Sequence, residues 1–128
     1  MKTQYDGYVA VDELRVKGDL TLGENVADLG GIKLAHAAME TWQKAKGAPT
    51  AEPWRYDDSQ QFFLGIAQAW CTKVRREQAA QRAATDPHAP PYWRVNGPLG
   101  NLDAFKQAFR CVDGDKMVRT GANRCTVW

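Results

Sequence analysis

The sequence from Leu22 to Lys46 predicts a single long helix. Thr21 precedes this segment and Glu24 follows three residues later, which is the T-x-x-E pattern of a capping box at a helix start. Gly47 and then Pro49 follow its last residue, as is common where a helix ends. We therefore expect a mainly α fold in which this helix is the longest element and the other helices pack near it.

Two carboxylates, Glu24 and Asp28, lie four residues apart at the start of the predicted helix, so they share one face of it. A stripe of mostly small side chains continues from Glu24 and would let another backbone approach closely: Ala27, Gly31, Leu34, Ala35, Ala38 and Trp42. We expect this to be the packed side, where a carboxylate needs a cation, a metal ion or several hydrogen bonds. Glu24 also fits a simpler interpretation, a capping residue favoured by the positive end of the helix dipole.

Two further helices are predicted in the second half of the chain. After a linker at residues 48–58, Asp58 or Ser59 can cap a second helix that continues to about Ala84. A third, short helix runs from about residue 102 to residue 110. The second helix is polar towards its end and carries one apolar face, formed by Phe63, Ile66, Ala67, Trp70 and Val74.

The remaining segments are predicted to lack long regular elements. Residues 5–20 contain short alternations of apolar and polar residues, which predict extended or turn-rich chain. Residues 85–101 contain four of the six prolines, so they are not expected to form regular helix. This second segment carries His88 and Arg94, and loops on a rigid scaffold are where functional side chains concentrate.

Composition limits the class of protein. With 128 residues, of which 44% are hydrophobic and 25% charged, the chain is one globular domain by length. No apolar run is long enough to span a membrane, and the first residues lack the apolar core of a signal peptide. The odd set of cysteines, Cys71, Cys111 and Cys125, indicates free thiols or disulfide partners on another piece of chain.

Five motifs occur in a fixed order along the chain. They are LTLGENVADLGG at residues 20–31, FFLGIAQAWC at 62–71, TDPHAPPYWRVNGPLGN at 85–101, AFRC with GDKM at 108–117, and CTVW at 125–128. Together they resemble the C-terminal part of the neprilysin-type zinc metallopeptidases, the family that includes endothelin-converting enzyme and bacterial oligopeptidases. The resemblance covers essentially the whole chain and implies the C-terminal portion of a zincin-like catalytic domain.

The resemblance implies roles for four side chains. Glu24 corresponds to the third protein ligand of the catalytic zinc, and Asp28 to a residue that accepts a hydrogen bond from a zinc-bound histidine. His88 corresponds to a donor to the oxyanion that develops on the attacked carbonyl, and Arg94 to a group that holds a substrate carbonyl. The implied activity is that of a zinc endopeptidase or oligopeptidase acting on small peptides outside the cytoplasm.

One part of the family's pattern is missing. The family's other two zinc ligands and its catalytic base lie on a His-Glu-x-x-His helix, whereas the only histidines here are His36 and His88. We therefore expect residues 1–128 to be a C-terminal fragment of a catalytic domain, inactive and without zinc when isolated. Its partner would be the upstream part of the same chain, which would also supply disulfide partners for the cysteines. A fragment with uncovered apolar surface is also expected to self-associate.

Smaller departures from the family pattern surround the site. Arg76 stands where the family usually has proline in an RPE triplet, which we expect to let the second helix continue. Ala89 replaces the usual serine after His88, and Trp93 replaces the usual phenylalanine before Arg94. These changes leave the predicted chemistry in place.

Two other functions compete with the peptidase. The first is a non-catalytic interaction module that uses the small-residue stripe to bind another chain. The second is a nucleic-acid module, which the net charge of +2 does not favour because the acidic residues balance the basic ones. The basic residues that would form it are Arg75, Arg76, Arg82 and Arg94. A His-Glu-x-x-His motif upstream in the parent reading frame would favour the peptidase.

Overall fold

A computed structural model describes residues 1–47 and 55–127. In these residues the chain is mainly helical, as predicted, with one small antiparallel sheet. The elements are α1 (Lys2–Asp6), β1 (Val9–Val11), β2 (Leu14–Arg15), α2 (Leu22–Lys46), α3 (Asp58–Ala69), α4 (Arg76–Thr85), α5 (Pro91–Leu99), α6 (Asp103–Ala108) and a 3-10 turn (Gly121–Asn123). None of the described helices is both long and apolar enough to cross a membrane. Most of the predicted linker, residues 48–54, and Trp128 of the CTVW motif lie outside the described residues.

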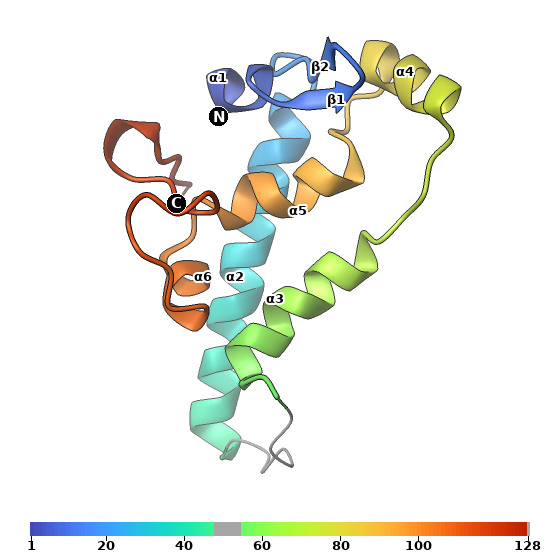
Figure 1. Cartoon of the computed structure of the whole chain (residues 1–128). Coiled ribbons are helices and arrows are strands. Elements are labelled where there is room, and N and C mark those ends of the chain that lie inside the picture. The colour runs from blue at the N-terminus through green and yellow to red at the C-terminus, as the bar shows by residue number, and fades with distance from the viewer. Residues whose placement is uncertain (48–54, 128) are drawn as a thin grey trace.

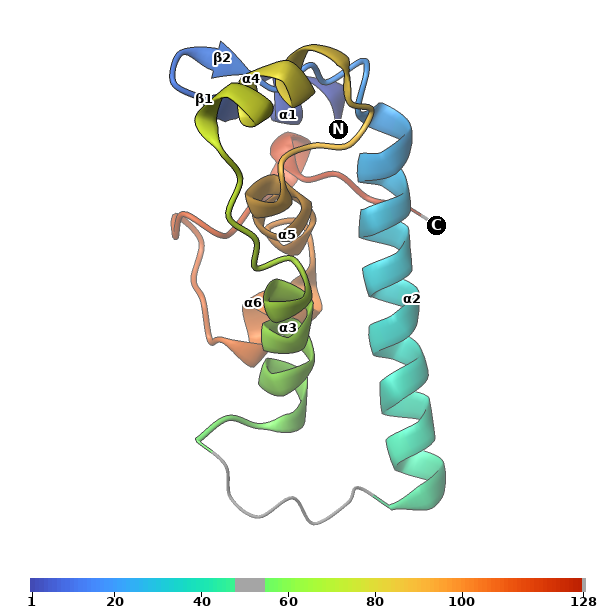
Figure 2. The ribbon, with the colours of Figure 1, turned by 90° about the vertical axis from the view of Figure 1, so that its right-hand side faces the viewer.

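The helix α2 forms one side of the molecule, and the shorter helices lie along it (Figures 1 and 2). Its bounds agree with the prediction, and it ends at Gly47, whose φ of +75° suits a glycine. The capping-box prediction is wrong, because the Thr21 side chain makes no capping hydrogen bond. Its hydroxyl instead donates to the Lys17 carbonyl and accepts a hydrogen bond from Asn25. The Glu24 side chain is thereby left for other contacts.

The packed face of α2 also differs from the prediction. All six residues of the small-residue stripe are exposed, from Ala27 to Trp42. The buried face instead carries Asn25, Leu29 and His36. Large side chains on this face bury more apolar area against α5 and α3 than small ones would, which explains why it faces inward. His36 has a structural role, since it is buried and stacks against Phe63 of α3.

The second predicted helix is interrupted. Its first part, α3, ends at Ala69, and α4 begins only at Arg76, so the prediction of one helix to about Ala84 is wrong. Tertiary contacts decide the break: the Trp70 ring lies under the Arg94 guanidinium, and α4 turns away to pack on β1 and β2. Arg76 is the first residue of α4, a position at which proline is well tolerated. Its substitution for the usual proline therefore does not join the two helices.

Residues 91–99 form a helix where an irregular loop was predicted. The prolines are compatible with this helix, since Pro91 occupies its first position and Pro98 its last turn. This helix, α5, contributes to two hydrophobic clusters among the described residues. Near the start of α5, Trp93 packs against a cluster that contains Tyr5. Further along α5, Val95 belongs to a second cluster, which residues of α3 and α6 also form. Arg94 is therefore held by a well-packed element.

The turn-rich prediction for residues 5–20 is correct for a hairpin of two short strands, β1 and β2, but α1 precedes it. The third predicted helix is present as α6. Asn101, which is 2% exposed, ties the N-terminus to the C-terminal segment. Its side chain donates to Gln4 and to the Gly97 carbonyl and accepts a hydrogen bond from the Cys125 N–H.

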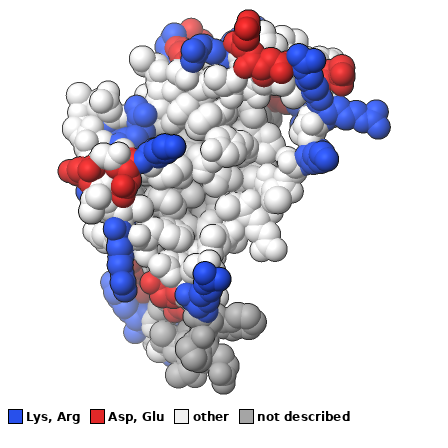
Figure 3. Space-filling view, viewed as in Figure 1, with Lys and Arg blue, Asp and Glu red and all other residues white. Residues whose placement is uncertain are grey.

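Charged side chains are unevenly placed on the face shown in Figure 3. Acidic and basic residues both occur around the edge of this face, and most of its centre, over α3 and α5, carries neither. Large apolar side chains such as Leu64 and Tyr92 are exposed on these two helices. This face therefore offers no extended patch of a single charge.

Candidate functional site

The four residues singled out in the sequence meet at one place. Glu24 and Asp28 lie on the first turns of α2, Arg94 lies on the first turn of α5, and His88 lies on the segment that leads into α5. His88 Nε2 is 3.2 Å and Arg94 Nη2 is 3.5 Å from the same Glu24 oxygen. Segments more than 60 residues apart in sequence thus form a single cluster of two acids and two bases.

Arg94 is fixed by Asp28 on one side and by Trp70 on the other. Its Nε and Nη2 donate to the two carboxylate oxygens of Asp28 at 2.8 and 2.7 Å, a bidentate pair. The Trp70 ring lies 4.2 Å from the guanidinium carbon, within range of a cation–π interaction. The hydrogen bonds to Asp28, and then the charges of Asp28 and Glu24, raise the pKa of Arg94. Among the described residues its Nη1 has no hydrogen-bond partner, so two N–H groups remain available.

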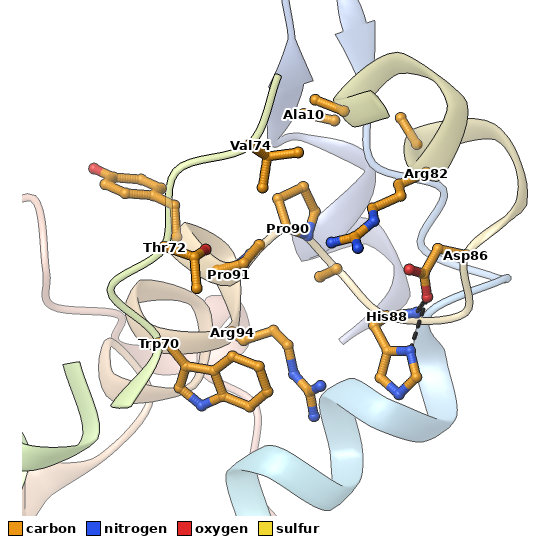
Figure 4. Close-up of a pocket in the computed structure, with 14 residues that line it drawn as sticks. Ala10, Trp70, Thr72, Val74, Arg82, Asp86, His88, Pro90, Pro91 and Arg94 are labelled. Atoms are coloured by element: carbon orange, nitrogen blue, oxygen red, sulfur yellow. Dashed lines mark hydrogen bonds and ion pairs between the residues drawn. The ribbon is translucent and has the colours of Figure 1, made fainter. Parts of the chain in front are cut away.

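His88 is held by Asp86. The Asp86 carboxylate accepts hydrogen bonds from the His88 backbone N–H at 2.9 Å and from its Nδ1 at 2.8 Å (Figure 4). These two bonds keep the pKa of Asp86 below its usual value. The other ring nitrogen, Nε2, faces Glu24. Both ring nitrogens therefore face a carboxylate, a group that only accepts hydrogen bonds when ionised.

Local sequence explains this geometry. Asp86-Pro87-His88 forms a turn in which the aspartate side chain bonds to the backbone two residues on, a common role of aspartate. Pro90 and Pro91 then restrict the backbone up to the start of α5. The spacing between His88 and Arg94 is therefore set by a rigid segment and one helical turn.

Glu24 is suited to bind a metal ion. Its side chain is 40% exposed, and one carboxylate oxygen faces His88 and Arg94. The other oxygen makes no hydrogen bond among the described residues. In those residues there is no group of three or more His, Cys, Asp or Glu that could hold a metal ion. Glu24 therefore fits one ligand position of a zinc site, whose remaining ligands would come from other residues.

A cavity of about 400 Å³ opens beside the cluster (Figure 4). It lies between Trp70 at the end of α3, the helix α4 and the first turn of α5. Its lining is mostly apolar, and His88 and Arg94 lie at its edge. Such a cavity next to polar groups is a common form of binding site for part of a ligand.

Sequence reasoning missed three residues of this region. Asp86 orients His88, Trp70 supports Arg94, and Arg82 lines the cavity. The D-x-H spacing could have revealed Asp86, because it is typical of a side-chain turn. No local signal could have revealed Trp70 or Arg82, because both depend on where α3 and α4 separate. The sequence also contains no signal that Arg94 pairs with Asp28.

Comparisons with known proteins agree with this geometry. The sequence model of Peptidase family M13 matches residues 1–125. An endothelin-converting enzyme homolog of Locusta migratoria is 42% identical over 98% of this chain and 17% of its own length. Human endothelin-converting enzyme 1 is 41% identical over 100% of this chain and 16% of its own length. The chain thus spans about a sixth of the length of these relatives.

Solved structures of a zinc metalloprotease share the fold of this chain. A zinc metalloprotease of Mycobacterium tuberculosis in an open state superposes with a TM-score of 0.89 and 37% identity, over 99% of this chain and 20% of that one. The same enzyme in complex with an inhibitor superposes with a TM-score of 0.88. The motifs, the fold and the cluster around Glu24 all lead to one assignment: this chain belongs to Peptidase family M13, as a neprilysin- and endothelin-converting-enzyme-type peptidase region.

Proposed function

We propose that this chain is the C-terminal part of a zinc endopeptidase or oligopeptidase that cleaves small peptides outside the cytoplasm. The observation that carries this proposal is the convergence of Glu24, Asp28, His88 and Arg94 at the edge of one cavity. Membership of the M13 family and similarity to a zinc metalloprotease support it. The chain itself contains no His-Glu-x-x-His motif, so the remaining zinc ligands and the catalytic base would come from upstream sequence.

In this proposal Glu24 is a zinc ligand and Asp28 orients a histidine ligand supplied by the upstream part. Bound zinc supplies a nucleophilic water and polarises the attacked carbonyl. Asp28 already binds Arg94 through both oxygens, but each carboxylate oxygen can accept a second hydrogen bond. One aspartate would thus connect a metal ligand to a substrate-binding side chain.

His88 would donate a hydrogen bond from Nε2 to the oxyanion that develops on the substrate carbonyl. Asp86 holds the ring by Nδ1, so the donor is oriented before substrate arrives. Glu24, which now faces Nε2, would turn towards the metal ion and leave this nitrogen to the substrate. Such a preorganised donor stabilises the transition state more than the ground state and therefore affects kcat.

Arg94 would hold a substrate carbonyl through Nη1, the part of its guanidinium that Asp28 and Glu24 leave unbound. This contact exists in both the ground state and the transition state, so it mainly affects KM.

The exposed stripe on α2 supports an upstream partner. Its two large members, Leu34 and Trp42, are 58% and 54% exposed. We propose that the upstream part of the peptidase covers this stripe, and that the isolated chain is inactive and self-associates through it. The free cysteines, of which Cys71 is exposed, would pair with cysteines of that upstream part. The same exposed stripe keeps the alternative of a non-catalytic interaction module open.

Peptide hydrolysis by the longer protein tests the proposal. With a fluorogenic peptide, we expect His88→Ala to lower kcat by about 100- to 1,000-fold. Arg94→Lys should mainly raise KM, and the control Arg119→Lys, outside the site, should change neither constant. A parent protein without a His-Glu-x-x-His motif and without activity would overturn the peptidase and favour the interaction module.

A further inference from the structure

Arg82 is the one cavity-lining residue whose charge the proposed mechanism does not use. It lies on α4, and its guanidinium points into the space bounded by Pro90, Asp86 and His88 (Figure 4). Among the described residues it makes no hydrogen bond and no ion pair. The first residue of the same helix, Arg76, pairs with Asp12 at 2.8 Å. The donors of Arg82 are therefore free, and they face the cavity.

The acids near Arg82 are already engaged. Asp86 accepts two hydrogen bonds from His88, and Arg82 adds only a small electrostatic effect on it. Asp28 and Glu24 lie on α2 and bind Arg94. The cavity lining contains two arginines and only one acidic residue, Asp86. Arg82 is thus the charged side chain of the cavity lining that no described residue binds.

The walls of the cavity are apolar. Trp70, Val74, Ala79 and Pro90 line it, and they can cover the methylene groups of an incoming side chain. A guanidinium at the end of an apolar cavity suits a carboxylate, which it can bind through two hydrogen bonds. An uncharged side chain of the same size would gain the apolar contacts but not the charged ones.

We propose that Arg82 makes this cavity select substrates that carry a carboxylate on the side chain of the residue after the cleaved bond, as glutamate does. The proposal rests on the proposed function, because His88 and Arg94 at the cavity edge hold two carbonyls of the substrate. The side chain between two adjacent carbonyls belongs to the residue that follows the cleaved bond. Arg82 would bind the charged side chain of this residue.

The test uses the zinc-loaded peptidase that contains this chain and two quenched peptides that differ only by Glu or Gln after the cleaved bond. We expect kcat/KM to favour the Glu peptide by about fivefold, a modest factor because Arg82 is exposed to water. Arg82→Gln should remove the preference and Arg82→Lys should keep part of it. The control Arg75→Gln removes a nearby charge that does not line the cavity, and should leave the preference intact. The preference should also weaken as salt is raised.

A binding measurement separates this effect from catalysis. The zinc-free protein should bind the Glu peptide more tightly than the Gln peptide, again in an Arg82-dependent way, because Arg82 does not act through the metal. Discrimination between the two peptides that depends on Arg82 supports the proposal. Equal cleavage and equal binding of the two peptides would overturn it, whereas no cleavage of either peptide would overturn the proposed function itself.

Discussion

Two aspartates hold the two basic side chains of the site, and they do so in different surroundings. The Asp28–Arg94 pair is nearly buried, with side chains 14% and 13% exposed, and both carboxylate oxygens are used. Removing one member of such a pair would leave the other charge buried and unpaired. The Asp86–His88 pair is more open, at 29% and 42%. Asp28 therefore contributes to both packing and position, whereas Asp86 mainly orients a ring.

The acid dependence of stability tests the contact between Asp86 and His88. The pKa of Asp86 lies below its ordinary value of 3.8, because of the hydrogen bonds from His88. A carboxylate with a lowered pKa in the folded state stabilises the fold above pH 3.8, and this contribution disappears as pH falls through the folded value. We expect wild type to exceed Asp86→Asn in free energy of unfolding by at most about 1 kcal/mol near neutral pH. In urea titrations this gap should shrink below pH 3.8, and a gap of constant size would contradict the contact.

At the scale of elements, the sequence predicts α2 well, because its termini carry clear signals and no breaker interrupts it. The break between α3 and α4 could not be predicted, because residues 70–75 contain neither Gly nor Pro and the chain turns there for tertiary contacts. The sequence did not predict α5, because prolines usually interrupt a helix. Pro91 and Pro98, however, occupy positions of α5 at which proline is tolerated. The spacing of four residues on one helix predicted that Glu24 and Asp28 lie on the same face. Their approach to His88 and Arg94 followed only from the family resemblance.

The contact between α1 and α5 makes a specific prediction about two glycines. A Cβ on Gly97 of α5 would lie 2.4 Å from the hydroxyl oxygen of Tyr5, which is fully buried. Gly97→Ala should therefore lower the free energy of unfolding by about 1–3 kcal/mol through overpacking. The control is Gly65→Ala in α3, where a Cβ meets nothing within 4 Å. This change should raise stability by about 0.5–1 kcal/mol, because alanine favours a helix interior. Equal effects of the two changes in urea denaturation would show that α1 does not press on α5.

At the scale of the whole molecule, the chain forms one wall of a site. α2 presents Glu24 beside the cavity, and its small-residue stripe lies exposed along the same helix (Figure 2). The chain spans about a sixth of the length of its curated relatives. An exposed stripe and the single carboxylate proposed as a zinc ligand, Glu24, both fit the proposal that upstream sequence packs against α2 and completes a metal site.

Zinc content of the longer peptidase tests the assignment of Glu24 most directly. After dialysis and metal analysis, we expect stoichiometric zinc in the wild type and in His88→Ala, because His88 is proposed to bind substrate and not the metal. Glu24→Ala should lose its zinc, whereas Glu40→Ala, an exposed acid farther along α2, should retain it. Stoichiometric zinc in Glu24→Ala would contradict the assignment of this side chain as a ligand.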